Sequence, residues 1–110
     1  MHVLEIILPY DVDPEIEEEY RRLKYLLKAK VKVITVNCST FNEYLEYLRE
    51  VYGGRGIIDY IYVDAENLPV FILDGKVIVE GNYPDVYELL ELLRYYGVKL
   101  RKRRRHRHLF

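Results

Sequence analysis

Residues 67–85 read N-L-P-V-F-I-L-D-G-K-V-I-V-E-G-N-Y-P-D, and this stretch decides the fold. Two short runs rich in β-branched and aromatic residues, 70–73 and 77–79, lie on either side of the pair Asp74-Gly75. An Asp-Gly pair in such a position is the strongest short-range signal for a β-hairpin, because a type I′ turn needs positive φ and glycine adopts it freely. The stretch therefore predicts two antiparallel strands joined by a tight turn.

A helix is predicted directly after the hairpin. Gly81 and Pro84 end the second strand, and Asp85 with Glu88 forms a capping-box pattern. Apolar residues then recur at helical spacing as far as Gly97, which is the expected C-cap.

The chain before the hairpin predicts a β-α-β unit. Residues 3–8 form the apolar run typical of a buried strand, and Pro9 ends it. Asp13 and Pro14 suit the N-cap and the first position of a helix. The apolar stripe expected on this helix is Ile16, Tyr20, Leu23 and Leu27. Residues 31–36 form the next strand, so we expect two parallel strands joined by a right-handed crossover.

The middle of the chain predicts a second helix and an extra strand. The helix is indicated by helical spacing of Phe41, Tyr44, Leu45, Leu48 and Tyr52. Residues 57–63 have strand composition, which predicts an additional edge strand with Tyr60 and Tyr62 on one side. An exposed edge of that composition invites pairing between two copies, so a homodimer is an open alternative.

The whole pattern over residues 3–97 resembles the thioredoxin-like fold. The Leu68-Pro69 pair, the Asp-Gly-Lys turn and the closing helix are similar to the C-terminal half of that fold, and residues 81–84, G-N-Y-P, resemble a turn of arsenic-metallochaperone relatives. The resemblance implies an α/β sandwich of order βαβ-α-ββα, with a mixed sheet and helices on both faces. It also implies a cis peptide bond before Pro69 and a peptide-facing cleft bordered by Tyr10, Asp11, Leu68 and Pro69.

The chemistry of that family is missing from its usual place. Redox members carry Cys-x-x-Cys where the first strand meets the first helix, and the metallochaperone relatives carry their cysteines in the same loop. Residues 9–14 read P-Y-D-V-D-P here, without a cysteine. Because thiol–disulfide exchange requires an attacking thiolate, we expect a scaffold with no catalytic residue and no cofactor.

Cys38 is the only cysteine of the chain and has two interpretations. It is either a small half-buried side chain or a reactive thiol, favoured by the start of the helix that follows it. A metal site is not expected, because His106 and His108 alternate with arginines and no group of ligands has the spacing of a structural zinc site.

The composition indicates a cytoplasmic protein. No apolar run approaches the length of a membrane span, and the N-terminus lacks the basic and apolar regions of a signal peptide. Gln and Trp are absent while charged residues abound, a bias that matches hyperthermophile proteins.

The charge divides the chain into an acidic body and a basic tail. Residues 1–98 carry 10 Lys and Arg against 18 Asp and Glu, whereas residues 99–110 carry no acidic residue. The basic residues of the tail are Lys99, Arg101, Lys102, Arg103, Arg104, Arg105 and Arg107. We therefore predict a thioredoxin-like domain over 1–98 and a tail over 99–110 whose self-repulsion keeps it disordered when free.

The tail has the clearest physical consequence for function. Its cations can displace counterions from the phosphates of nucleic acid, or contact an acidic protein, or lie against the acidic body, or stay solvated. The acidic body argues against a broad nucleic-acid-binding surface outside the tail. The leading hypothesis is a non-catalytic binding or adaptor domain whose tail contacts nucleic acid or an acidic protein. The alternative is a divergent thiol oxidoreductase or metalloid-handling protein that uses Cys38.

Overall fold

The computed structural model describes residues 1–37, 42–44, 46–47, 49–50 and 67–101. Four of the predictions above lie wholly or largely outside these residues. They are the thiol of Cys38, the second-helix stripe except Tyr44, the edge strand over 57–63 with the self-association expected from it, and the tail from Lys102 onward.

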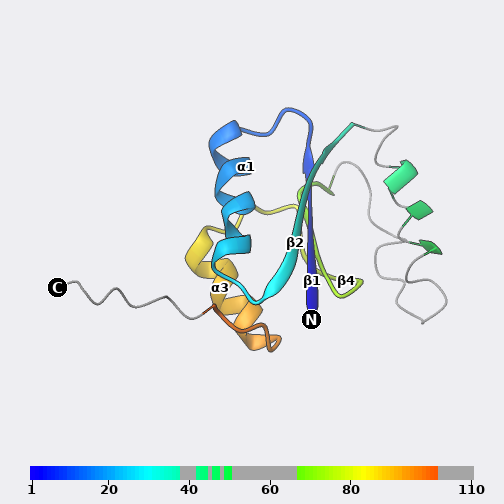
Figure 1. Ribbon diagram of the computed structural model, residues 1–110. Coiled ribbons are helices and arrows are strands. Elements are labelled where there is room, and N and C mark those ends of the chain that lie inside the picture. Colours follow the sequence, from blue (N-terminus) through cyan, green and yellow to red (C-terminus); the bar gives the residue numbers. More distant parts are fainter. Residues whose placement is uncertain (38–41, 45, 48, 51–66, 102–110) are drawn as a thin grey trace.

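Four strands form one mixed sheet, which confirms the predicted α/β class (Figure 1). The strands are β1 (His2–Pro9), β2 (Ala29–Val36), β3 (Val70–Leu73) and β4 (Lys76–Glu80), and their order across the sheet is β2-β1-β3-β4. β2 runs parallel to β1, β3 runs antiparallel to β1, and β4 runs antiparallel to β3. Within this sheet β2 and β4 are therefore the two outer strands.

Helices lie on both sides of the sheet (Figure 1). α1 (Pro14–Arg21), the 3-10 helix η1 (Arg22–Tyr25) and α3 (Val86–Tyr95) follow the chain, and α1 and α3 cover one face. The described residues between 42 and 50 are helical and lie on the opposite side.

The predicted helix starts are confirmed. Asp13 Oδ1 accepts a hydrogen bond of 2.8 Å from the backbone N–H of Glu15, and Pro14 is the first residue of α1. At α3, Asp85 Oδ1 accepts from the N–H of Glu88 at 2.8 Å, and Glu88 Oε1 accepts from the N–H of Asp85 at 3.1 Å. These bonds satisfy backbone donors that have no partner within the helix.

The first helix is shorter than its apolar stripe predicts. α1 ends at Arg21, and the chain tightens into η1 before it turns toward β2. Leu23 and Leu27 are both fully buried, and the carbonyl of Leu23 accepts from the N–H groups of Leu26 and Leu27. The tightened turn therefore brings both leucines into the core, although they do not continue one regular α-helix.

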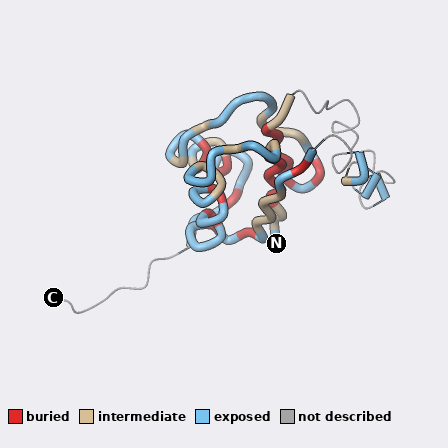
Figure 2. Tube along the Cα trace, turned by 90° about the horizontal axis from the view of Figure 1, so that it is seen from above, coloured by how far each residue is buried: buried red, intermediate tan, exposed pale blue. Residues whose placement is uncertain are grey.

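The main core lies between the sheet and the helices α1 and α3. Alternate residues of β1, namely Leu4, Ile6 and Leu8, are buried against Leu23, Leu27, Phe71, Leu89 and Leu93. Tyr20 packs the edge of its ring on Phe71, with ring centroids 5.2 Å apart. Figure 2 shows the buried positions concentrated in the sheet and in the helix surfaces turned toward it.

The Asp-Gly hairpin forms as predicted. Asp74 and Gly75 both have positive φ, 52° and 86°, and they join β3 to β4. Asp74 also ties the turn to β1, because its carboxylate accepts hydrogen bonds from the N–H of Val3 at 2.8 Å and from Nδ1 of His2 at 2.6 Å.

Glu5 is the buried acidic residue of the described sheet. It lies in β1 between Leu4 and Ile6, so its side chain points to the opposite face from theirs, and only 1% of its surface is exposed. Its Oε2 accepts a hydrogen bond of 2.6 Å from the hydroxyl of Tyr44, whereas Oε1 has no partner among the described residues. The hydrogen bond thus attaches the helical residues 42–44 to this second face.

Candidate nucleic-acid interface

A long part of the chain contains no acidic residue. Between Glu19 and Glu43 the sequence has neither Asp nor Glu, and it has six basic residues. These are Arg21, Arg22, Lys24, Lys28, Lys30 and Lys32. In the structure this part forms the end of α1, η1 and all of β2.

The start of the tail is attached to the same part of the fold. The backbone N–H of Lys28 donates to the carbonyl of Lys99 at 2.8 Å, and the N–H of Arg101 donates to the carbonyl of Leu26 at 2.7 Å. Leu27 and Leu100 form an antiparallel bridge between these two bonds. Residues 99–101 thus lie beside residues 26–28 as a short paired segment, and the described structure extends past the predicted domain end at residue 98.

Gly97 directs the chain into this position. Its φ of 91° reverses the backbone after α3, and its N–H donates to the carbonyl of Arg94 at 2.9 Å. The next N–H, that of Val98, donates to the carbonyl of Leu93 at 2.9 Å, and the side chain of Val98 is buried. The predicted C-cap is therefore present, and it sends the basic residues that follow back toward η1 and β2.

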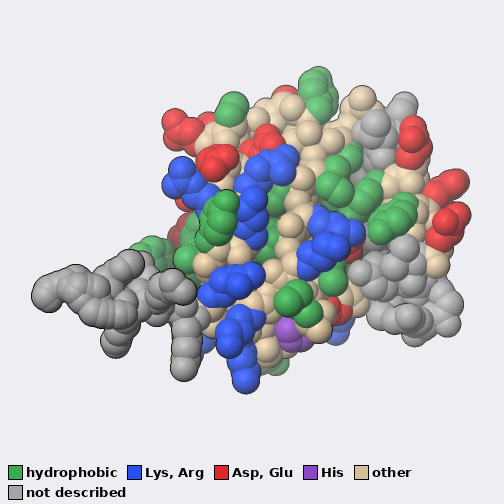
Figure 3. Space-filling view, viewed as in Figure 1, with side chains coloured by type: hydrophobic (Ala, Val, Ile, Leu, Met, Phe, Trp, Pro, Cys, Tyr) green, Lys and Arg blue, Asp and Glu red, His purple; other side chains and the backbone are tan. Residues whose placement is uncertain are grey.

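The two segments together present what we call the basic face. Its members are Lys24, Lys28, Lys30, Lys32, Lys99 and Arg101. Arg101 is held in place a second time, because its Nε donates to the carbonyl of Lys24 at 3.0 Å. Lys30 and Lys32 are two residues apart on the outer strand β2 and so project on the same side of the sheet. Figure 3 shows Lys and Arg side chains gathered across this view, with acidic side chains mainly toward its upper left and right edges.

Among the described residues, no ion pair links the basic face to an acidic side chain. Arg21 and Arg22 pair with Glu17 and Glu18 one turn earlier, at 2.6 and 3.2 Å. Within the described part of the chain, no carboxylate lies within salt-bridge distance, 4.0 Å, of a member of the basic face. Two of its lysines contact aromatic rings instead: Lys24 Nζ is 5.1 Å from the ring centroid of Tyr25, and Lys32 Nζ is 5.7 Å from that of Tyr47. Their charges therefore remain available to an anionic partner.

The predicted cleft residues occupy separate environments. Tyr10 and Asp11 are exposed in the loop after β1, while Leu68 is half-buried and Pro69 is buried directly before β3. The Leu68–Pro69 peptide bond is cis, and the carbonyl of Pro69 accepts from the N–H of Gly81 at 2.8 Å. Since Val70 pairs with Ile7, Pro69 lies near the end of β1 from which the loop departs.

A small pocket lies near this loop, and none of those four residues lines it. It has a volume of about 180 Å³ and is lined by Ile16, Glu19, Tyr20, Tyr83, Pro84, Asp85 and Val86. Burial, with the nearby charges of Glu19, Tyr83 and Asp85, raises the pKa of Tyr20 to about 12. Burial and the charge of Asp11 also raise the pKa of Tyr83. The Tyr20 hydroxyl donates a hydrogen bond to the carbonyl of Pro84 at 2.9 Å.

The described residues offer neither a cluster of metal ligands nor a membrane-spanning helix. These residues contain no group of three or more His, Cys, Asp or Glu side chains placed to hold a metal ion. None of the helices described is long and apolar enough to cross a membrane.

The sequence analysis missed the basic face because it averaged the charge over the whole body. The excess of acids in residues 1–98 argues against a basic surface there, but the acids are not evenly spread. The absence of acidic residues between Glu19 and Glu43 was the signal that could have revealed it. The positions of Lys99 and Arg101 beside this stretch depend on the tertiary structure.

Comparisons with family models and with curated sequences give no lead to the function of this chain. No protein-family model matches it, and no curated protein matches it in sequence. The basic face and the pocket are therefore interpreted from their own chemistry.

Proposed function

We propose that this protein binds nucleic acid through the phosphate backbone, using the basic face together with the tail that continues from it, and without a catalytic step. The observation that carries the proposal is the pairing of residues 99–101 with residues 26–28. This pairing makes the cations of β2 and η1 continuous with the tail. The five basic residues that follow Arg101 in the sequence extend the same positive charge.

The charge state of the basic face favours binding to a polyanion. Because its members have no carboxylate partner among the described residues, no such ion pair has to be broken when phosphates approach. Each phosphate neutralised by Lys or Arg releases condensed counterions, which drives association and makes it sensitive to salt. Contacts of this kind carry no sequence preference, so we expect binding that tolerates many sequences.

We also propose that the scaffold is thioredoxin-like. The strand order β2-β1-β3-β4, the mixed strand directions and the helices on both sides support this assignment. The loop over residues 9–14 has no cysteine for the family's redox chemistry, which supports a binding or adaptor role. A thiol or metalloid function through Cys38 gains no support from the described residues, because Cys38 lies outside them.

Charge reversal tests the proposal. The double variant Lys28→Glu with Lys30→Glu changes the basic face, and Lys76→Glu is the control because Lys76 is also exposed but lies on β4, the opposite outer strand. Binding of labelled DNA duplex and RNA is followed by fluorescence anisotropy at low salt. We expect the double variant to bind about tenfold more weakly or worse, and the control to stay within about twofold of the unmodified protein.

Two results would contradict the proposal. If the unmodified protein binds neither nucleic acid at low salt, the phosphate partner is excluded and an acidic protein becomes the partner to seek. If Lys76→Glu weakens binding as much as the double variant does, the effect comes from overall charge and the basic face has no particular role.

A further inference from the structure

Tyr25 is an exposed aromatic ring among the cations of the basic face. It ends η1, and 69% of its surface is exposed. Lys24 Nζ lies 5.1 Å from its ring centroid. The backbone next to it is fixed, because the carbonyl of Lys24 accepts from Arg101 Nε at 3.0 Å and the carbonyl of Leu26 accepts from the N–H of Arg101 at 2.7 Å. The ring is thus exposed to solvent on a segment whose backbone is hydrogen-bonded, with the positive charge of Lys24 beside it.

Tyr47 is a second exposed ring with a lysine beside it, although Glu46 precedes it in the sequence. It belongs to the described helical residues 46–47, 44% of its surface is exposed, and Lys32 Nζ lies 5.7 Å from its ring centroid. Lys32 comes from β2, whereas Tyr25 lies in the η1 segment that precedes β2. Both exposed rings therefore lie beside a lysine of the basic face.

From these two lysine–tyrosine contacts we infer that the nucleic acid bound by this protein is single-stranded. This inference rests on the proposed function and names its ligand class. Bases of a single strand are free to stack on an exposed ring, while their phosphates contact the lysines beside it. In a duplex the bases are already stacked on each other, so a ring on a protein surface gains no comparable contact. Tyr25 is the first stacking platform and Tyr47 the second.

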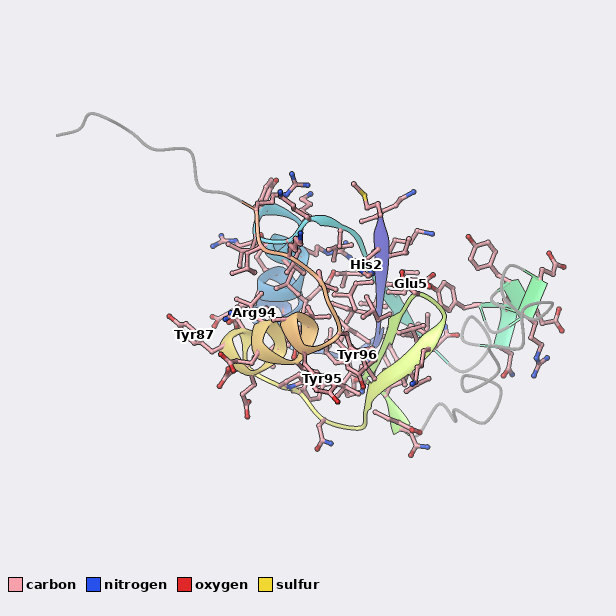
Figure 4. The ribbon with its side chains drawn as sticks, turned by 90° about the horizontal axis from the view of Figure 1, so that it is seen from below. His2, Glu5, Tyr87, Arg94, Tyr95 and Tyr96 are labelled. Carbon is pink, nitrogen blue, oxygen red and sulfur yellow. The ribbon has the colours of Figure 1, made fainter. Side chains whose placement is uncertain are left out.

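Two further exposed tyrosines of the described structure lie in a different setting. Tyr87 is on α3 with 83% of its surface exposed, and Tyr95 is at the end of the same helix, where its ring contacts Tyr96 edge-on at 5.3 Å. Figure 4 shows Tyr87, Arg94 and Tyr95 along α3, on a different element from the basic face. Tyr87 lies on α3, which carries no member of the basic face, so it is a matched control of equal chemistry outside that face.

The test compares a labelled single strand of thymidines with a DNA duplex of the same length, at one salt concentration and with the full chain. We expect the unmodified protein to bind the single strand more tightly than the duplex. Tyr25→Leu is expected to weaken single-strand binding by roughly fivefold or more, since stacking of one base contributes that much, while duplex binding stays within about twofold. Tyr47→Leu should act in the same direction, and Tyr87→Leu should change neither affinity.

Tyr25→Trp keeps a stacking surface and is expected to bind the single strand at least as tightly as the unmodified protein, which guards against a variant that merely fails to fold. If single strand and duplex bind equally and Tyr25→Leu changes neither, the inference is overturned while the proposed function stands. If neither nucleic acid binds the unmodified protein, the proposed function itself fails.

Discussion

Tyr20 joins three parts of the fold through one side chain. Its ring packs edge-on against Phe71 of β3, and its hydroxyl donates to the carbonyl of Pro84 in the turn before α3. The residue itself belongs to α1. A buried hydroxyl with a satisfied hydrogen bond fixes the relative positions of α1, the sheet and the start of α3.

We predict that Tyr20→Phe lowers the free energy of unfolding by about 1 kcal/mol at neutral pH, because the carbonyl of Pro84 loses its donor. The free energy of unfolding of the variant should also fall less steeply above pH 10 than that of the unmodified protein. With a folded pKa of about 12 against 10 for an ordinary tyrosine, both states are protonated below pH 10. Between pH 10 and 12 the unfolded state ionises first, so stability falls as the pH rises.

Urea denaturation of both proteins at pH 7 and at several values between 10 and 11.5 measures the two effects. The difference between the proteins isolates Tyr20 from the other tyrosines and the lysines. A Tyr20→Phe variant that loses stability as steeply as the unmodified protein above pH 10 would show that Tyr20 does not hold its proton in the folded state.

At the scale of elements, the segment 99–101 pairs with residues 26–28, which connect η1 to β2. Two backbone hydrogen bonds and the Leu27–Leu100 bridge hold it. The buried side chain of Val98, directly before it, packs in the main core. The basic residues Lys99 and Arg101 therefore have fixed positions relative to Lys24 and Lys28.

We predict different stabilities for two truncated chains. A chain ending at Arg101 should unfold within about 0.5 kcal/mol of the full chain, whereas a chain ending at Val98 should lose about 1–2 kcal/mol, because Lys28 N–H and the carbonyl of Leu26 lose their partners. Urea denaturation of the three chains at neutral pH measures the difference. Equal stability of the two truncated chains would mean that the paired segment contributes nothing to folding.

At the scale of the whole molecule, the charges are separated in space. Among the described residues, acidic side chains lie at the start of α1, on α3 and at Glu43, Glu46 and Glu50, whereas the basic face follows η1, β2 and the segment 99–101. The lysines on the outer strand β2 also discourage pairing between copies through that edge. A molecule with this separation presents one side to a polyanion and repels it with the other.

We predict that the tail and the basic face each contribute to the salt dependence of nucleic-acid binding. Removing residues 102–110 takes away five Lys and Arg, so the slope of log affinity against log salt concentration should become shallower by at most about 4 to 5 for a DNA duplex. The chain ending at Arg101 should keep a measurable slope, supplied by the basic face. Anisotropy titrations across a salt series measure both slopes. A complete loss of binding in the shortened chain would assign all phosphate contacts to the tail.

Local signals were sufficient for most elements of this fold. The Asp74-Gly75 turn, the caps at Asp13 and Asp85 and the reversal at Gly97 each depend on neighbours within a few residues, and each was predicted. The end of α1 was not, because Leu23 and Leu27 keep helical spacing while the core requires the tighter turn of η1. Of the candidate interface, the role of the tail stays a prediction from its composition, and the basic face on the folded body was not predicted.

The sequence by itself determined the hairpin, the helix starts, the mixed α/β class and the positive charge of the tail, because each is set by residue type and short spacing. Only the tertiary structure decided that residues 99–101 lie beside residues 26–28, more than 70 positions earlier in the chain. No local pattern specifies such a contact. It follows from the turn of the backbone at Gly97 and from the burial of Val98. These two features place Lys99 and Arg101 beside Lys24 and Lys28 in one basic face.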